Sequence, residues 1–550
     1  MSNSWVSTLY RVLLIVTAVL IVVTVRDLTR DRSFNVVILT IDSLRSSDFT
    51  AKSAPVFFST MQEALTPREH RTVSAWTAPN IIAILSGLSP FDQGVHARGQ
   101  FISQNVQTPL GQLADQGWKV GNVQAFAKTD VFQNLGITVD TGQGWKSWLA
   151  DRQRNGEKFV FWHHYLDVHL PYSPASASVQ ADLPSLSRDQ QSRIDIVRTR
   201  SAIPVGSVDF EAQDQPLIHD LYLSGIQQFD RWFTVFWRHF TKLGLDQDTI
   251  LIVTADHGEE LLERGRVGHA STTHDASLHE EIVNIPLFVL LPRRHPWRQT
   301  GGQFGADLST DHLDIMPTML SLMGISAPQS LPGRDLTVDQ STRQWFAYSS
   351  KGGYGEPDPH NISSFVAATM NESCKLTVRV EDGEIVAHGM YDLLSDRLEL
   401  TNLLNSSPQR GQGARCGRNM DESVRQRLNE KISTAHLFES RQERVADGQD
   451  VPVLLWPKPS TRLGYDELAG RFAIEWSGDP SASYILGYEL GESPFSLSGE
   501  MRVEGTRKEF GDVDRHYWET WVVPYGKARI KIRAEGAQQW SAWETVYFQE

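Results

Sequence analysis

The feature that most restricts how this chain can fold is an apolar run that ends in a carboxylate. Residues 35–41 (NVVILTI) show no alternation of apolar and polar side chains, and Asp42 follows directly. Such a run is typical of a strand that is buried on both faces, as in a parallel sheet. The N-terminal half of the chain is therefore predicted to contain an α/β domain.

Three similar runs follow, at residues 159–162, 249–254 and 286–291, with helical segments such as 220–243 between them. Strands that alternate with helices predict a doubly wound, mostly parallel sheet. Ligands of such sheets sit beyond the carboxyl ends of the strands. The polar residues expected at these ends are Asp42, the pair His163–His164, and the pair Asp256–His257.

The composition is that of a globular chain of three or four units, with 550 residues and 40% hydrophobic side chains. A net charge of −14 argues against a nucleic-acid partner. Cys374 and Cys416 fit no metal-site spacing, and the sequence leaves open whether they form a disulfide or are two buried thiols.

The N-terminal segment, residues 1–33, is predicted to be an uncleaved membrane anchor. Its apolar run 12–25 spans about 21 Å as a helix, and extension back to Trp5 gives about 31 Å, close to a bilayer core. No signal-peptidase site follows the run. One arginine, Arg11, precedes the run, and three follow it: Arg26, Arg30 and Arg32. Charge alone would therefore favour a cytoplasmic location for the rest of the chain.

The C-terminal regions differ in pattern from the first domain. Residues 341–445 are mixed, with a short strand expected at 375–380, and are predicted to be a small α+β part of the first domain. From residue 451 to 550, apolar and polar residues alternate, and six of the 16 tryptophans fall there. This pattern predicts a separate antiparallel β-sandwich.

Asp42 and the pair Asp256–His257 provide oxygen and nitrogen donors suited to a metal ion. The simpler alternative is that Asp42 only caps the next helix. Gly258 is expected to let the backbone turn sharply after the pair.

Thr77 is predicted at the N-cap of a helix that has Pro79 in its first turn. A helix N-terminus attracts anions, and a hydroxyl beside a metal can become a nucleophile. The alternative is that Thr77 is merely a cap. Three histidines downstream of the strand ends, His169, His269 and His274, are further candidates.

Taken in order, these segments resemble the sulfatases and related phosphotransferases of the alkaline phosphatase superfamily. The resemblance covers residues 34–440, with a catalytic domain over 34–340, and rests on 36–45, 76–87, 164–172, 256–260, 278–286, 311–318 and 390–393. It implies one divalent ion (zinc, manganese or calcium) held by Asp42, Thr77, Asp256 and His257. It also implies that Thr77 is the nucleophile, and that His169 and His274 contact the anionic group or assist the leaving group, with His269 a weaker candidate.

Two departures from the sulfatase pattern change this expectation. Ser43 stands where many sulfatases have a second Asp ligand, and the stretch 77–81 lacks both the Cys or Ser that is converted to formylglycine and the following Arg. A threonine nucleophile is similar to that of membrane-anchored phosphoethanolamine and phosphoglycerol transferases. This similarity implies a place on the periplasmic face of the inner membrane. No Asp-x-x-x-His lies between the third strand and Asp256, which favours one metal.

The predicted function is metal-dependent hydrolysis or transfer of a phosphate or sulfate ester, on a lipid or a glycan, through Thr77. The alternatives are a sulfatase with an unusual nucleophile and a non-catalytic binding protein that keeps the fold. Residues 451–550 resemble a fibronectin type III module, with Trp476 as the core tryptophan and Ala528 in place of the usual corner tyrosine. The loops 97–110 and 173–215 are expected to set specificity.

Overall fold

The computed structural model describes most of the chain between residues 33 and 548. The described ranges are 33–95, 101–102, 106–172, 186–273, 275–350, 365–371, 373–381, 384–405, 416, 426, 452, 454–456, 462–463, 471–490, 497–512, 527–535, 540–541 and 543–548. The predicted anchor lies outside them except for Ser33, and His274 lies outside them as well. Within these ranges, no helix combines the length and the apolar character that a membrane span requires.

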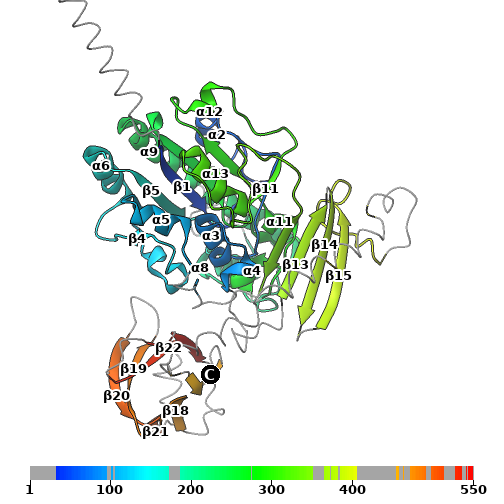
Figure 1. The fold of residues 1–550 in the computed structure, drawn as a ribbon. Helices are drawn as coiled ribbons and strands as arrows, with labels where there is room; N and C mark the ends of the chain where they lie inside the picture. The colour runs from blue at the N-terminus through cyan, green and yellow to red at the C-terminus, as the bar shows by residue number, and fades with distance from the viewer. Residues whose placement is uncertain are drawn as a thin grey trace, which may run out of the picture.

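A six-stranded sheet forms the centre of the N-terminal domain, in the order β10-β6-β1-β5-β3-β4. Figure 1 labels β1, β4 and β5 of this sheet. Its strands are β1 (Asn35–Ile41), β3 (Lys119–Asn122), β4 (Thr138–Val139), β5 (Phe159–Tyr165), β6 (Thr249–Ala255) and β10 (Leu287–Leu290). The predicted mostly parallel sheet is confirmed, since only β10 runs antiparallel to its neighbour. As an edge strand, β10 adds its hydrogen bonds to β6 without needing a crossover helix.

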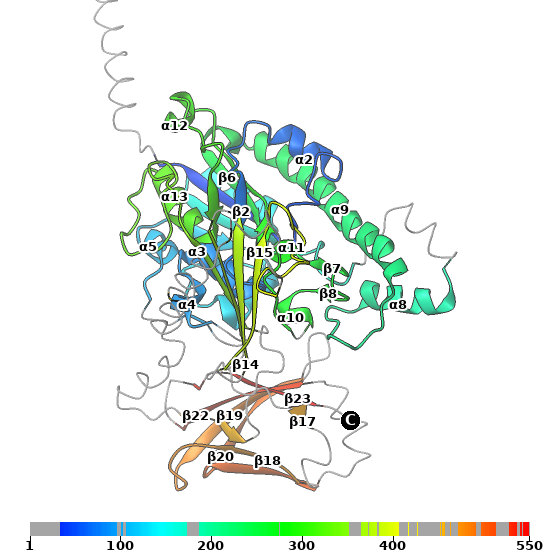
Figure 2. The ribbon, with the colours of Figure 1, turned by 90° about the vertical axis from the view of Figure 1, so that its right-hand side faces the viewer.

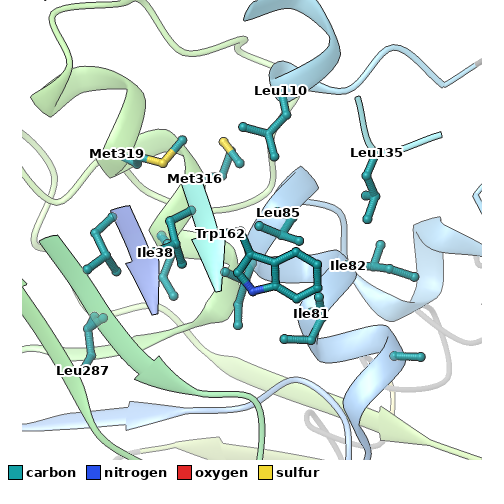
Figure 3. Close-up of a cluster of buried hydrophobic side chains, with 14 of the residues drawn as sticks. Ile38, Ile81, Ile82, Leu85, Leu110, Leu135, Trp162, Leu287, Met316 and Met319 are labelled. Atoms are coloured by element: carbon teal, nitrogen blue, oxygen red, sulfur yellow. The ribbon is translucent and has the colours of Figure 1, made fainter. Parts of the chain in front are cut away.

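Side chains of β1 alternate between two hydrophobic layers, which explains why its sequence is apolar throughout. Val36 and Ile38 face one layer, covered by α3 (Thr77–Ser86), α5 (Pro109–Asp115) and α13 (Ile315–Leu322). Figure 3 shows Ile38 and Trp162 in this layer, near Ile81 of α3. Each such buried side chain contributes about 1.5–3 kcal/mol to folding.

The opposite layer packs Val37 and Leu39 under α2 (Pro55–Thr60), α6 (Trp145–Asn155), α8 (Arg188–Thr199) and α9 (Gln215–Lys242). Helix α9 presents a phenylalanine stripe at helical spacing, Phe229, Phe233, Phe236 and Phe240. The rings of Phe57 on α2 and Phe233 on α9 lie 4.8 Å apart, and the two helices run side by side in Figure 2.

Two smaller sheets adjoin the central one. The first has the order β11-β2-β9, from β2 (Glu69–Arg71), β9 (Asn284–Ile285) and β11 (Ser309–Asp311). The second is an antiparallel sheet of β12 (Trp345–Ser349), β13 (Phe365–Asn371), β14 (Cys374–Glu381) and β15 (Glu384–Asp392). The sequence predicted only the strand 375–380 of this sheet. A disulfide joins Cys374 to Cys416, which answers the question that the sequence left open.

The β12–β15 sheet is tied to the first domain by hydrogen bonds and by buried charges. Trp345 Nε1 donates to the carbonyl of Thr72 at 2.8 Å. Buried Lys375 Nζ lies 3.2 Å from Glu280 Oε1 and 2.8 Å from Glu399 Oε1. A cation between two buried carboxylates satisfies charges that would otherwise be costly to bury.

The strands from residue 454 onwards form two sheets with a shared core, so the predicted C-terminal β-sandwich is confirmed. One sheet contains β16 (Leu454–Trp456), β18 (Arg471–Trp476) and β21 (Arg507–Asp512). The other contains β17 (Arg462–Leu463), β19 (Ser483–Leu490), β20 (Leu497–Glu504), β22 (Lys527–Ala534) and β23 (Glu544–Phe548). Trp476 is buried between them with Leu486 and Ile530. The resemblance to fibronectin type III stays a prediction.

Candidate active site

Three strand ends meet because the register of the parallel strands aligns them. Ile41 of β1 lies opposite both Tyr165 of β5 and Ala255 of β6. Asp42, His164 and Asp256 therefore reach the same edge, and one ligand-type atom from each lies within 4.8 Å of the others. All three are buried, so the expected convergence of polar residues from distant parts of the sequence is confirmed.

His257 adds a second imidazole to this group. Its Nε2 lies 3.7 Å from Asp42 Oδ1 and 3.3 Å from Asp256 Oδ2. Its Nδ1 lies 2.8 Å from the carbonyl of Gly258, which can only accept a hydrogen bond, so Nδ1 carries the proton and a neutral ring has its Nε2 lone pair directed at the carboxylates. That lone pair is available to a cation placed between the ring and the carboxylates.

The donor set fits a divalent cation. Asp256 Oδ2 is fully buried and has no hydrogen-bond partner among the described residues, although it faces the group. Burial and the nearby Asp42 carboxylate both raise the pKa of Asp256. Burial would also raise the pKa of Asp42, but the charge of His169 and the hydrogen bond from His164 lower it well below its usual range. Two buried carboxylates repel each other when both are charged, and a cation would remove that repulsion.

Ser43 ties the two carboxylates together. Its hydroxyl donates to Asp42 Oδ1 and its backbone N–H donates to Asp256 Oδ1, both at 3.1 Å. This geometry requires a left-handed backbone, with φ of 60° at a residue other than glycine. Such strain costs about 1–3 kcal/mol and is typical of functional sites. Ser43 thus positions both acids.

His164 is held by contacts on both sides of its ring. Nδ1 lies 2.8 Å from Thr40 Oγ1, which also accepts a hydrogen bond from Trp162 Nε1 at 2.9 Å. Nε2 lies 3.2 Å from Asp42 Oδ2, and the ring of Phe126 stacks on the imidazole at 4.9 Å. The His163–His164 pair was predicted at the strand end, but neither residue was predicted to be a metal ligand.

The neighbour, His163, points to the other face of the sheet and stacks on Trp232 at 5.0 Å. Successive strand residues alternate between faces, so only one of two adjacent histidines can reach a given layer. This alternation, applied to the register with β1, is the signal that would have selected His164.

Thr77 is the first residue of α3, not its N-cap as predicted; Trp76 is the cap residue, and no side chain caps the helix. Asn80 instead holds the preceding loop, since its Oδ1 accepts from the backbone N–H groups of Val73 and Ser74 at 3.1 and 2.9 Å. The Thr77 hydroxyl lies 3.2 Å from His257 Nε2. Thr77 therefore does not cap α3, and its role as a nucleophile stays a prediction.

Two of the three candidate histidines lie beside this group. The rings of His257 and His269 are 4.0 Å apart, and those of His269 and His169 are 5.0 Å apart. His269 Nδ1 lies 2.8 Å from Glu259 Oε1. The sequence ranked His269 below His169, although His269 is the one in contact with His257. His274 lies outside the described residues.

Gly258 is required for a reason other than the expected sharp turn. Its φ is not among the positive values of the chain, so no left-handed turn occurs there. A Cβ at this position would lie 1.9 Å from the carbonyl oxygen of Glu281. Gly258 N also donates to the carbonyl of Ile282 at 2.7 Å. Close approach of two backbone segments, and not chain reversal, excludes a side chain here.

Several curated proteins are similar in sequence to part of this chain. Arylsulfatase K of Bos taurus is 30% identical over 210 residues, which cover 37% of this chain and 35% of the bovine protein. The chain therefore spans about a third of the length of the curated relatives that it matches first.

Among solved structures, the phosphonate monoester hydrolase of Silicibacter pomeroyi superposes with a TM-score of 0.54 at 18% identity, over 74% of this chain and 97% of that protein. A Bacteroides thetaiotaomicron protein, described with the metabolism of multiple glycosaminoglycans, gives a TM-score of 0.52 at 15% identity, over 73% and 96% of the two chains. At these identities the superpositions establish the fold.

The family model for the sulfatases matches residues 34–325, which is more than half of the 550 residues. The matched region contains the strand ends, the Thr77 loop and the histidines described above. This chain belongs to the sulfatase family.

Proposed function

We propose that this protein cleaves an ester of phosphoric or sulfuric acid, with the Thr77 hydroxyl as the attacking group. The observation that carries the proposal is the position of Thr77 Oγ1, 3.2 Å from His257 Nε2 at the start of α3. The group of Asp42, His164 and Asp256 lies beside His257. The proposed nucleophile, the helix N-terminus that would bind the anion, and the candidate metal ligands thus lie close together.

Asp42, His164, Asp256 and His257 would hold the divalent ion. When bound, such an ion offsets negative charge on the ester oxygens and favours loss of a proton from a nearby hydroxyl. The first-turn N–H groups of α3 are oriented to bind the anionic group of the substrate. His269 lies next to His257, and His169 lies next to His269, where an imidazole can donate a hydrogen bond to the anion or a proton to the leaving oxygen.

We favour a phosphate ester because Thr77 cannot be converted to formylglycine in the manner implied for sulfatases. Thr77 Oγ would form a bond to phosphorus while the bond from phosphorus to the leaving oxygen breaks, and that oxygen takes up a proton. Water would then release phosphate from the threonine. Release to an acceptor alcohol instead would make the protein a transferase, as the resemblance to phosphoethanolamine and phosphoglycerol transferases suggests.

A sulfate ester is the second candidate, and the matching relatives support it. Bovine arylsulfatase K carries the sulfatase name, and the Bacteroides protein was described with glycosaminoglycan metabolism. A sulfated glycan is the substrate that these names suggest for this chain.

The test is a panel of chromogenic phosphomonoesters, phosphodiesters and sulfate esters, assayed with the full chain before and after treatment with a chelator. We expect chelator-sensitive turnover of a phosphate ester that is lost in Thr77→Ala. Turnover of sulfate esters alone would favour the second candidate. Absence of turnover across the panel in metal-loaded protein would favour the non-catalytic binding protein.

We also propose that the folded part of the chain lies outside the cytoplasm, anchored by residues 1–33. The Cys374–Cys416 disulfide supports this location, because disulfides persist in oxidising compartments. Cells whose outer membrane has been opened are treated with a protease that cannot cross the inner membrane, and the protein should be digested. Complete protection from the protease under these conditions would place the protein in the cytoplasm.

For residues 451–550 we propose an independently folding module of fibronectin type III type. The separate core around Trp476 supports this. The excised fragment should unfold in one cooperative transition, and a non-cooperative melt would contradict the proposed boundary.

A further inference from the structure

We infer that this site selects a nitrogen-preferring ion of the zinc class over calcium, because His164 supplies the ligand that an acid at position 43 would otherwise provide. The inference rests on the proposed function and deepens it by naming the ion. It is carried by four observations on the residues around Asp42.

The first observation is that position 43 holds a serine and not a carboxylate. Ser43 uses its hydroxyl and its backbone N–H to donate to Asp42 and Asp256. As a donor to both acids, it is oriented to hold them and not to bind a cation. The site is left with two carboxylates, whereas calcium takes six to eight oxygen ligands in proteins.

The second observation is that both imidazoles are fixed with the same nitrogen facing the acids. Nδ1 of His257 is held by the Gly258 carbonyl, and Nδ1 of His164 is held by Thr40 Oγ1. In both residues, Nε2 therefore faces Asp42, at 3.7 and 3.2 Å from its oxygens. Histidine ligands are typically fixed in this way, by a hydrogen bond to the ring nitrogen that does not bind the metal.

The third observation is the burial of the whole set. Asp42 is 3% exposed, and His164, Asp256 and His257 are 0% exposed. Such burial limits the access of the several water ligands with which calcium or magnesium would complete a shell on so few carboxylates.

The fourth observation is Asp256 Oδ2, a fully buried oxygen with no hydrogen-bond partner among the described residues. It lies 3.3 Å from His257 Nε2, with its acceptor directed into the group. Two carboxylates and two imidazoles are the donor types that zinc prefers, and carboxylate, carbonyl and water are those that suit calcium and magnesium.

The test measures ion binding without substrate, so that it does not depend on turnover. Full-length protein is stripped with a chelator and titrated with Zn²⁺ alone and with Ca²⁺ alone, in competition with a chromogenic chelator. We expect Zn²⁺ to bind at least about 100-fold more tightly than Ca²⁺, given the preference of imidazole for zinc. His164→Ala should weaken Zn²⁺ binding by about 100-fold or more, and change Ca²⁺ binding by less than about threefold.

The matched control is His163→Ala, because His163 is the adjacent residue on the same strand and faces Trp232. It removes an imidazole from β5 without touching the group, so both affinities should stay within about threefold of wild type. If His164→Ala fails to fold, as judged by its melting curve, His164→Gln replaces it and retains a side chain near Thr40.

The reverse experiment combines Ser43→Asp with His164→Ala. Aspartate tolerates the left-handed backbone of position 43 better than most residues. The double variant exchanges a nitrogen donor for an oxygen donor and should lower the Zn²⁺ to Ca²⁺ affinity ratio by about 100-fold or more.

Equal affinity of the wild-type protein for Zn²⁺ and Ca²⁺ would overturn the inference, as would equal weakening of both ions in His164→Ala. Tight zinc binding without any ester cleavage would leave the inference standing and overturn the proposed function instead. Ester cleavage supported by Ca²⁺ and not by Zn²⁺ would overturn the inference and leave the proposed function standing.

Discussion

Replacing Thr77 by alanine separates the chemistry of the hydroxyl from its structural contribution. The hydroxyl makes one contact that bears on stability, the 3.2 Å approach to His257, and it caps no helix. Loss of one such hydrogen bond costs about 1 kcal/mol, and alanine recovers about 0.5 kcal/mol as the better helix former. The net change in unfolding free energy should be about 0.5 kcal/mol, which shifts Tm by only about 1–2 °C in a domain of this size.

Turnover should respond much more strongly. If Thr77 forms the bond to phosphorus, its removal should lower kcat by about 10³-fold or more, equivalent to about 4 kcal/mol of transition-state stabilisation. The assay measures kcat, metal content and Tm on the same preparation. Thr77→Ser keeps the hydroxyl and should stay within about tenfold of wild type.

Ser74→Ala is the control for a hydroxyl removed from the same loop, because Ser74 Oγ is buried and has no hydrogen-bond partner among the described residues. It should leave kcat within about threefold of wild type. If Thr77→Ala kept more than about a tenth of the wild-type kcat, a loss of under about 1.4 kcal/mol, water would be the attacker. The covalent mechanism and the transferase proposal would then both be wrong.

Four further predictions concern stability and packing. Burial would raise the pKa of Glu399, but Lys375 lowers it to about 2, so the wild type should lose stability in urea titrations as pH falls from about 4.5 towards 2. Lys375→Met should lower the unfolding free energy at pH 7 by roughly 3 kcal/mol and flatten that pH dependence; a variant that melts like wild type would contradict it. Cys416→Ser removes the disulfide, whose two cysteines are 42 residues apart, and should lower the unfolding free energy by about 4 kcal/mol in chemical denaturation. If reduction of the wild type left its unfolding free energy unchanged, this prediction would be wrong. Gly258→Ala should lose both metal binding and folding yield, because its Cβ would overlap the Glu281 carbonyl; normal metal content in that variant would refute the packing argument.

The sequence was most informative where buried strands end. Asp42 and Asp256 could be placed at one sheet edge because apolar runs without alternation mark parallel strands, whose carboxyl ends meet. His164 could not be separated from His163 without the register, which decides which face each side chain takes. Thr77 was misplaced by one residue because Asn80 supplies the loop-holding bonds from inside the helix, an arrangement that capping preferences do not describe. The run 286–291 gave no sign of its antiparallel direction, since a fully apolar strand looks the same either way.

The attachment of the β12–β15 sheet has a consequence for where the chain can be shortened. The sulfatase match ends at residue 325, and the predicted boundary lies at 340, but Trp345 hydrogen-bonds to Thr72, five residues before Thr77. A fragment that stops at either position lacks Trp345 and Lys375. The apolar surface that Trp345 covers would be exposed, and Glu280 would lose its lysine partner. The shortest fragment suited to expression and crystallisation should therefore run from about residue 33 to beyond Cys416. Its C-terminal end would then be linked to β14 by the disulfide.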